Sequence, residues 1–195
     1  FEKGNKTELQ EHIIKKNDYE LLPIKVIYGS NSVGKSNILT AFLTLKRIII
    51  NGTARKDEND YIGLCSNFDY KKDYETPIEF AITFLINEEI YNYKLHIKNH
   101  YAEKTSEVVY ETLKIDKEMI FERKKRNIEF SNKKNIIEKY YPLFKQKSFQ
   151  DKVKASLKDN ILNTSIFTTW LQNYSGNLCQ KIKEYFLNQT RVISN

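Results

Sequence analysis

The stretch Gly29-Ser30-Asn31-Ser32-Val33-Gly34-Lys35-Ser36 decides the fold class of this chain of 195 residues. It has the form G-x-x-x-x-G-K-[ST], in which the glycines let successive backbone N–H groups curve around phosphate oxygens. In this pattern the Lys35 ammonium lies near the β- and γ-phosphates, and the Ser36 hydroxyl can bind Mg²⁺. The stretch therefore predicts a nucleotide phosphate-binding loop.

The segments on either side of the loop have the pattern that such a loop needs. Residues 21–28 form an apolar, β-rich run that predicts a buried strand ending at Gly29. After the loop, apolar residues fall on one broad face of a helix, and Asn51-Gly52 supplies a stop signal: Ile38, Leu39, Ala41, Phe42, Leu43, Leu45, Ile48 and Ile49. Strand, glycine loop and helix predict an α/β chain with a P-loop NTPase fold.

From Pro77 onward apolar residues occur at every second position, as in a β-strand, and no longer at helical spacing. Residues 78–86 and 91–97 alternate around the turn Asn87-Glu88-Glu89 and predict an antiparallel hairpin. Further strands, separated by turns, are predicted at residues 107–115, 119–123 and 127–130. Together they predict an antiparallel meander over about 77–131, which gives the α/β chain some α+β character.

Helical spacing returns after Lys134. Apolar residues at 136–141, 153–157, 161–171 and 178–187 predict a helical subdomain over residues 135–195. The aromatic and aliphatic side chains of Phe167, Trp170 and Leu171 are expected to form contacts between these helices. Residues 1–134 then form a first domain with the loop and the meander, and residues 53–74 form a polar surface connection.

Composition narrows the possible partners and the compartment. Thirty-two Lys and Arg against 25 Asp and Glu leave a net charge of +7, which suits an acidic partner such as DNA as well as the nucleotide itself. Cys65 and Cys179 have no metal-type spacing and indicate a reduced, cytoplasmic setting. No apolar run is long enough to span a bilayer, so no membrane partner is expected.

The sequence distinguishes ATP from GTP as the expected nucleotide. Small GTPases read guanine with an N-K-x-D loop, but Asn132-Lys133-Lys134-Asn135 ends in Asn, and Asn5-Lys6-Thr7-Glu8 ends in Glu and precedes the loop. Read through to Ala41, the loop resembles the G-x-N-x-x-G-K-S-N-x-x-x-A form of RecF-like, SMC-like and overcoming-lysogenisation-defect ATPases, the ABC-type branch. The meander that follows is similar to the N-terminal half of AAA-type ABC ATPases of bacterial phage-defence and abortive-infection systems.

This resemblance implies an ATPase head that dimerises with ATP held between the loop of one subunit and the signature segment of the other. The nucleotide state then controls a nuclease or another effector. The residues that would bind ATP and Mg²⁺ are Gly29, Ser30, Asn31, Ser32, Val33, Gly34, Lys35, Ser36 and Asn37. Among them Lys35 would supply the catalytic positive charge, and Ser36 would be the Mg²⁺ ligand.

The sequence departs from this family in its hydrolytic half. No Walker B segment, four apolar residues followed by Asp-Glu, is found; Met119-Ile120-Phe121-Glu122 is the nearest match and lies among the meander strands. Tyr174-Ser175-Gly176-Asn177 is better explained as a helix-to-helix turn than as a signature segment. The missing Walker B segment and a start at Phe1 rather than Met together suggest that this chain is part of a longer protein. We therefore expect a C-terminal lobe outside it, and negligible hydrolysis by these 195 residues alone.

Three alternatives to an ATPase subunit of a defence complex stay open at this point. The first is a nucleotide-dependent oligomeric scaffold without significant turnover. The second is an ATPase of DNA repair or maintenance, and the third is a small P-loop kinase. A kinase should show parallel strands alternating with helices after the loop, whereas this sequence predicts hairpins.

Overall fold

The computed structural model describes residues 12–16, 19–21, 28–30, 34–51, 76–100, 105–156 and 177–189. The chain divides into two compact units, residues 1–40 and 41–195, and each is described by itself. In the first unit, β1 (Ile14–Lys16) and β2 (Tyr19–Leu21) pair in an antiparallel hairpin. Lys15 and Glu20 are cross-strand partners, and Lys15 Nζ lies 3.8 Å from Glu20 Oε1.

The expected buried strand over residues 21–28 is wrong at its C-terminal end. Leu21 is the last residue of β2, and Tyr28 lies outside any strand with 90% of its surface exposed. Residues 22–27, the rest of that prediction, lie outside the described residues.

Helix α1 (Lys35–Asn51) confirms the predicted helix and its end at Asn51. Only its C-terminal half is buried as expected, since Leu45, Ile48 and Ile49 pack in the core of the second unit. The large apolar side chains of its N-terminal half, Ile38, Leu39 and Leu43, are exposed. The apolar face is therefore as broad as the sequence indicates, but it is covered along half of its length.

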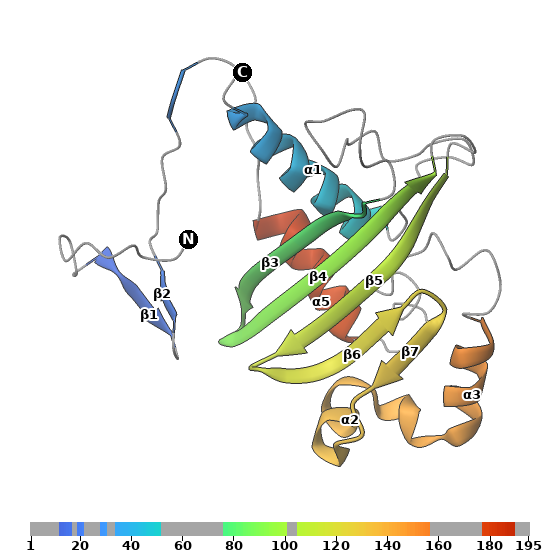
Figure 1. Ribbon diagram of the computed structural model, residues 1–195. Helices are drawn as coiled ribbons and strands as arrows, with labels where there is room; N and C mark the ends of the chain where they lie inside the picture. The colour runs from blue at the N-terminus through green and yellow to red at the C-terminus, as the bar shows by residue number, and fades with distance from the viewer. Residues whose placement is uncertain are drawn as a thin grey trace. The chain divides into compact units, whose positions relative to one another are not determined.

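The second unit is built on a five-stranded sheet, shown in Figure 1. Its strands are β3 (Ile78–Ile86), β4 (Glu89–His100), β5 (Thr105–Ile115), β6 (Glu118–Lys124) and β7 (Asn127–Phe130). They are adjacent in chain order and each pair is antiparallel, which confirms the predicted meander.

Two-residue turns join three of these strand pairs. Asn87-Glu88 and Asp116-Lys117 both have positive φ at the two central residues, the sign pattern of a type I′ turn. Between β6 and β7 only Lys125 has a positive φ, at 51°, which is the sign pattern of a type II′ turn. Both turn types match the right-handed twist of the strands that they connect.

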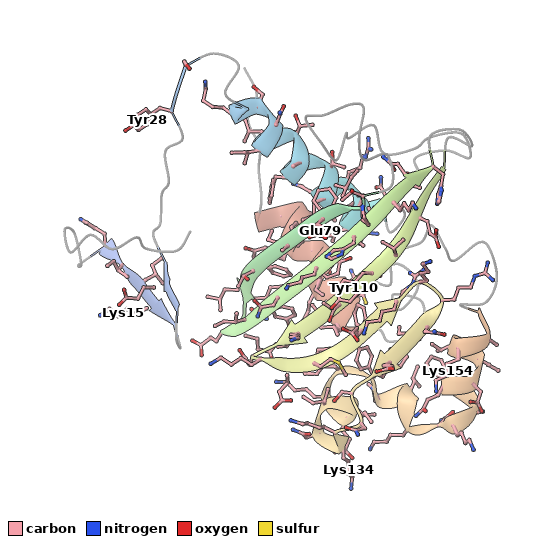
Figure 2. All side chains as sticks on the ribbon, in the orientation of Figure 1. Lys15, Tyr28, Glu79, Tyr110, Lys134 and Lys154 are labelled. Atoms are coloured by element: carbon pink, nitrogen blue, oxygen red, sulfur yellow. The ribbon has the colours of Figure 1, made fainter. Side chains whose placement is uncertain are left out.

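The two faces of the sheet differ in what covers them. One face packs against the C-terminal half of α1 and against α5 (Asn177–Glu184), which continues as a π-helical turn, η4 (Tyr185–Gln189) (Figure 1). Phe84 contacts both layers, because its ring lies 5.3 Å from that of Tyr91 and 5.2 Å from that of Phe186. The opposite face carries polar side chains, and Figure 2 shows Glu79 and Tyr110 on it.

Helices follow the sheet as the sequence predicts. They are α2 (Lys134–Tyr140), the 3₁₀ turn η2 (Pro142–Lys145) and α3 (Lys147–Ser156). The predictions for residues 53–74 and 161–171, Phe167, Trp170 and Leu171 included, lie outside the described residues, and the division at residues 134/135 stays a prediction. Among the helices that the structure describes, none has the length and apolar character needed to cross a membrane.

Candidate nucleotide-binding site

Lys35 is the first residue of α1, and its side chain reaches back to residues 29 and 30. Its Nζ donates hydrogen bonds to the carbonyl oxygens of Gly29, at 2.8 Å, and Ser30, at 2.6 Å. The ammonium group therefore lies beside the carbonyl groups of Gly29 and Ser30. A phosphate bound there would meet a positive charge that is already in position.

Gly34 has a φ of +87°, a left-handed conformation that residues with a Cβ rarely adopt. A Cβ built on Gly34 would lie 3.8 Å from Nδ2 of Asn37, which is an ordinary van der Waals contact. The backbone torsion, and not lack of space, is therefore what requires glycine here. This conformation lets the chain turn directly from the loop into α1.

The first turn of α1 is open to an anion. The Asn37 N–H donates to the Gly34 carbonyl oxygen at 3.0 Å, and Ser36 and Asn37 are exposed. No acidic residue lies in this first turn, so no side chain of the turn neutralises the partial positive charge of the helix N-terminus. Backbone N–H groups and the helix dipole together suit a phosphate.

The nine predicted site residues are described in part. Lys35 contacts Gly29 and Ser30, and Asn37 contacts Gly34, while Asn31, Ser32 and Val33 lie outside the described residues. The Ser36 side chain is exposed beside this cluster. No group of three or more His, Cys, Asp or Glu side chains suited to a metal occurs in the described part of the chain.

Comparison with protein families identifies the chain. Residues 24–161, which include the loop, α1, the whole meander, α2 and α3, match the family described as "AAA domain, putative AbiEii toxin, Type IV TA system". The chain belongs to this family of AAA domains. Neither a curated protein nor a solved structure matches it.

Membership establishes that this AAA domain has a P-loop NTPase fold and comes from a family of nucleotide-binding ATPases. It confirms the fold class that the loop and its flanks predict. The assignment to the ABC-type branch and the individual site residues stay predictions.

The segment nearest to a Walker B sequence has another role in the AAA domain. Glu122 lies in β6 between two antiparallel neighbours, and its carboxylate accepts hydrogen bonds from Tyr110 Oη, at 3.0 Å, and Lys124 Nζ, at 2.8 Å. The bonds from Lys124 and Tyr110 hold the pKa of this carboxyl below its usual range. The carboxylate of Glu122 is therefore held by contacts within the sheet.

The sheet holds a buried polar cluster that is not predicted from the sequence. Glu111 and Arg123 are 0% and 1% exposed, and Tyr93 Oη donates to Glu111 Oε1 at 2.6 Å. A signal for this cluster is present, because Glu111 is two residues before Leu113 and Arg123 is two residues after Phe121. At a strand period of two, both charged residues share a face with apolar core residues.

Proposed function

We propose that this AAA domain binds ATP and Mg²⁺ through residues 29–37 and acts as the ATPase subunit of an ABC-type complex. In this proposal the nucleotide state controls a nuclease or another effector in bacterial anti-phage defence, in the cytoplasm. The observation that carries the nucleotide site is the Lys35 ammonium at the start of α1, which donates to the carbonyl oxygens of Gly29 and Ser30. The family match supports the ATPase part.

Each part of the loop has a distinct task in this proposal. Backbone N–H groups of the loop and of the first turn of α1 hold the phosphate oxygens, and Lys35 stabilises the charge that develops during phosphoryl transfer. Ser36 offers its hydroxyl to Mg²⁺, which when bound neutralises charge on the β- and γ-phosphates. Asn31 and Asn37 complete the set of expected contacts.

Titration with ATP tests this site. We expect Lys35→Ala to weaken ATP binding by at least about tenfold, because the loss of one charge-assisted contact corresponds to about 1.5–3 kcal/mol. Ser36→Ala should remove most of the difference between titrations with Mg²⁺ and with EDTA. Arg47→Ala is the matched control, since Arg47 is an exposed cation on the same helix. Equal loss in the Lys35 and Arg47 variants, or tighter binding of GTP than of ATP, would contradict the proposed site.

A second candidate is a nucleotide-dependent scaffold, in which ATP holds a homodimer or higher oligomer together without significant turnover. One observation favours it for this chain: in the described residues the only Walker-B-like carboxylate, Glu122, is bonded to Tyr110 and Lys124. Molecular mass in solution, measured with and without ATP and Mg²⁺, distinguishes the two candidates when phosphate release is measured in parallel. Phosphate release that Lys35→Ala abolishes supports the ATPase. Because we expect negligible hydrolysis by these 195 residues alone, nucleotide-dependent assembly without phosphate release supports the scaffold only when it is measured on the natural, full protein.

The biological role is proposed from the resemblance to abortive-infection ATPases and from the family description, which refers to a toxin of a type IV toxin–antitoxin system. Phage plating on cells that express the protein with its native neighbours tests it. We expect protection to be lost with Lys35→Ala and kept with Arg47→Ala. If phage plating is unchanged but survival of DNA damage depends on Lys35, the role in DNA repair or maintenance replaces the role in defence.

A further inference from the structure

Positive charge is concentrated in one short helical segment of the second unit. Residues 133–154, which include α2, η2 and α3, hold seven lysines and two acidic residues, Glu138 and Asp151. Seven positive and two negative charges leave +5 in this segment, against +7 for the whole chain. All seven lysines are exposed: Lys133, Lys134, Lys139, Lys145, Lys147, Lys152 and Lys154.

Three of these lysines are used in ion pairs within the second unit. Lys133 pairs with Glu118 at 2.6 Å, Lys139 with Glu89 at 2.5 Å and Lys145 with Glu138 at 2.8 Å.

Three of the remaining lysines make no polar side-chain contact within the described residues. Within the described ranges Lys134, Lys147 and Lys154 form no ion pair or side-chain hydrogen bond. Figure 2 shows Lys134 extending from α2 away from the sheet, and Lys154 on α3. We call these three residues the lysine surface.

The side chains around the lysine surface favour one class of polyanion. On α3 Val153 is buried and Phe149 half-buried, and in the described part of residues 133–154 Leu143 is the one large apolar side chain that is exposed, too little for insertion into a lipid surface. Tyr140 and Tyr141 are also buried and cannot stack on unpaired bases. Exposed lysines without apolar or aromatic neighbours can still bind a partner through its charge alone. The phosphate backbone of a nucleic acid duplex is such a partner, because it carries negative charges at regular spacing.

We propose that the lysine surface binds the phosphodiester backbone of duplex nucleic acid without regard to sequence. Lysine is a flexible point charge that contacts phosphates, and such contacts carry no base information. Lys147 and Lys154 are seven residues apart on α3, or about 10 Å along the helix axis. That separation matches about three base-pair steps along one strand of a duplex. This binding is independent of the proposed ATP site.

The test is fluorescence anisotropy with a labelled duplex DNA of random sequence, a duplex RNA, a single strand of equal length and anionic phospholipid vesicles. We expect duplex binding with little sequence preference, stronger than binding to the single strand. The triple variant Lys134→Gln, Lys147→Gln, Lys154→Gln should bind the duplex at least about tenfold more weakly, with a salt slope smaller by about 3. The two duplexes show whether the backbone is that of DNA or of RNA.

The matched control is Lys94→Gln, Lys98→Gln, Lys114→Gln, which removes the same charge from the open face of the sheet. None of these three lysines forms an ion pair in the described part of the chain. Equal weakening by both triple variants would show an effect of net charge alone and overturn the proposal, as would binding to vesicles but not to duplexes. Circular dichroism checks the fold, and the pair Lys147→Gln, Lys154→Gln repeats the test if the triple variant is misfolded. Lys35→Ala should leave duplex binding unchanged, so failure of the ATP site and failure of this surface are distinguishable.

Discussion

Arg123 and Glu111 form an ion pair inside the sheet, where Arg123 Nη1 lies 3.7 Å from Glu111 Oε2. The two residues are cross-strand partners in β5 and β6, on the face that packs against the helices. Each has a second contact, since Arg123 Nε donates to the Lys125 carbonyl oxygen at 2.8 Å and Glu111 accepts from Tyr93. Burial lowers the pKa of Arg123, and the charge of Glu111 opposes that shift.

Removing one partner of this pair should be costly. Glu111→Ala leaves the Arg123 charge buried without its carboxylate, so we expect the free energy of unfolding to fall by about 3–5 kcal/mol. Urea denaturation measures this value. Glu129→Ala, an exposed position on β7, is the control and should change stability by less than about 0.5 kcal/mol.

The double variant Glu111→Leu, Arg123→Met separates a buried charge from a lost contact. Because both charges are removed together, we expect it to be more stable than Glu111→Ala. A double variant less stable than the single one would mean that shape, and not uncompensated charge, dominates at this site.

Glu89 joins the β3–β4 hairpin to α2. Its Oε1 accepts hydrogen bonds from Lys139 and from Tyr140 Oη, at 2.7 Å, and its Oε2 accepts from Tyr91 Oη at 2.9 Å. Burial by itself raises the pKa of this carboxyl, but the bonds from Lys139, Tyr140 and Tyr91 outweigh it and hold the pKa below its usual value. The ionised form is therefore the one that stabilises the fold.

This contact predicts acid sensitivity. A carboxyl with a lowered folded-state pKa contributes stability above its unfolded value, near about 4.3, and that contribution is lost as pH falls through the folded value. We expect Glu89→Gln to lower stability by about 1–2 kcal/mol at pH 7, and the difference from wild type to narrow below about pH 4. Thermal denaturation across pH measures both. Glu118→Gln breaks an exposed pair with Lys133 and should change stability by less than about 1 kcal/mol.

The same contact predicts a loss of stability in alkali. Burial, together with the hydrogen bond to Glu89, raises the pKa of Tyr140 to about 12. The stability that its proton supplies is complete below about pH 10, the unfolded value, and is lost as pH rises toward the folded value. Tyr140→Phe should reduce the loss of stability above about pH 10 but not abolish it, because burial also raises the pKa values of Tyr91, Tyr93 and Tyr141. If stability falls above about pH 10 equally in Tyr140→Phe and in the wild type, the loss comes from other groups.

Gly34→Ala tests whether the left-handed torsion of the loop matters for the proposed ATP site. Alanine at a φ of +87° costs about 1–2 kcal/mol of strain, although its Cβ has room. We expect ATP binding at least about tenfold weaker, measured by titration, because the loop moves to relieve the strain. Gly34→Asn should be milder, since Asn tolerates this region better than Ala does. Equal binding by Gly34→Ala and wild type would show that the torsion is not needed.

Lys125→Gly should stabilise the sheet. Lys125 has a φ of 51° at the first central position of the β6–β7 turn, where type II′ turns favour glycine. Relief of that torsion outweighs the added freedom of the unfolded chain, and we expect a gain of about 0.5–1 kcal/mol in urea denaturation. The Lys125 N–H bond to the Val109 carbonyl, at 3.0 Å, is kept. Arg126→Gly, at negative φ, is the control and should not stabilise.

Short-range patterns in the sequence predict much of the secondary structure of this protein. The glycines, Lys35 and Ser36 identify the loop because their spacing alone fits phosphates, and the family match agrees. Alternation and two-residue turns determine three of the four neighbouring pairs from β3 to β7, since such short turns leave each strand beside the next. These features depend on residues close together in the chain.

Only the tertiary structure decided which distant groups meet. Glu89 and Tyr140 are 51 residues apart, and nothing in either neighbourhood indicates that α2 returns to the first hairpin. The alternation places Glu111 and Arg123 on the core face, but their pairing depends on the register between β5 and β6. The physical reason is that residue spacing determines local torsion and periodicity, whereas long-range contacts depend on how whole elements pack.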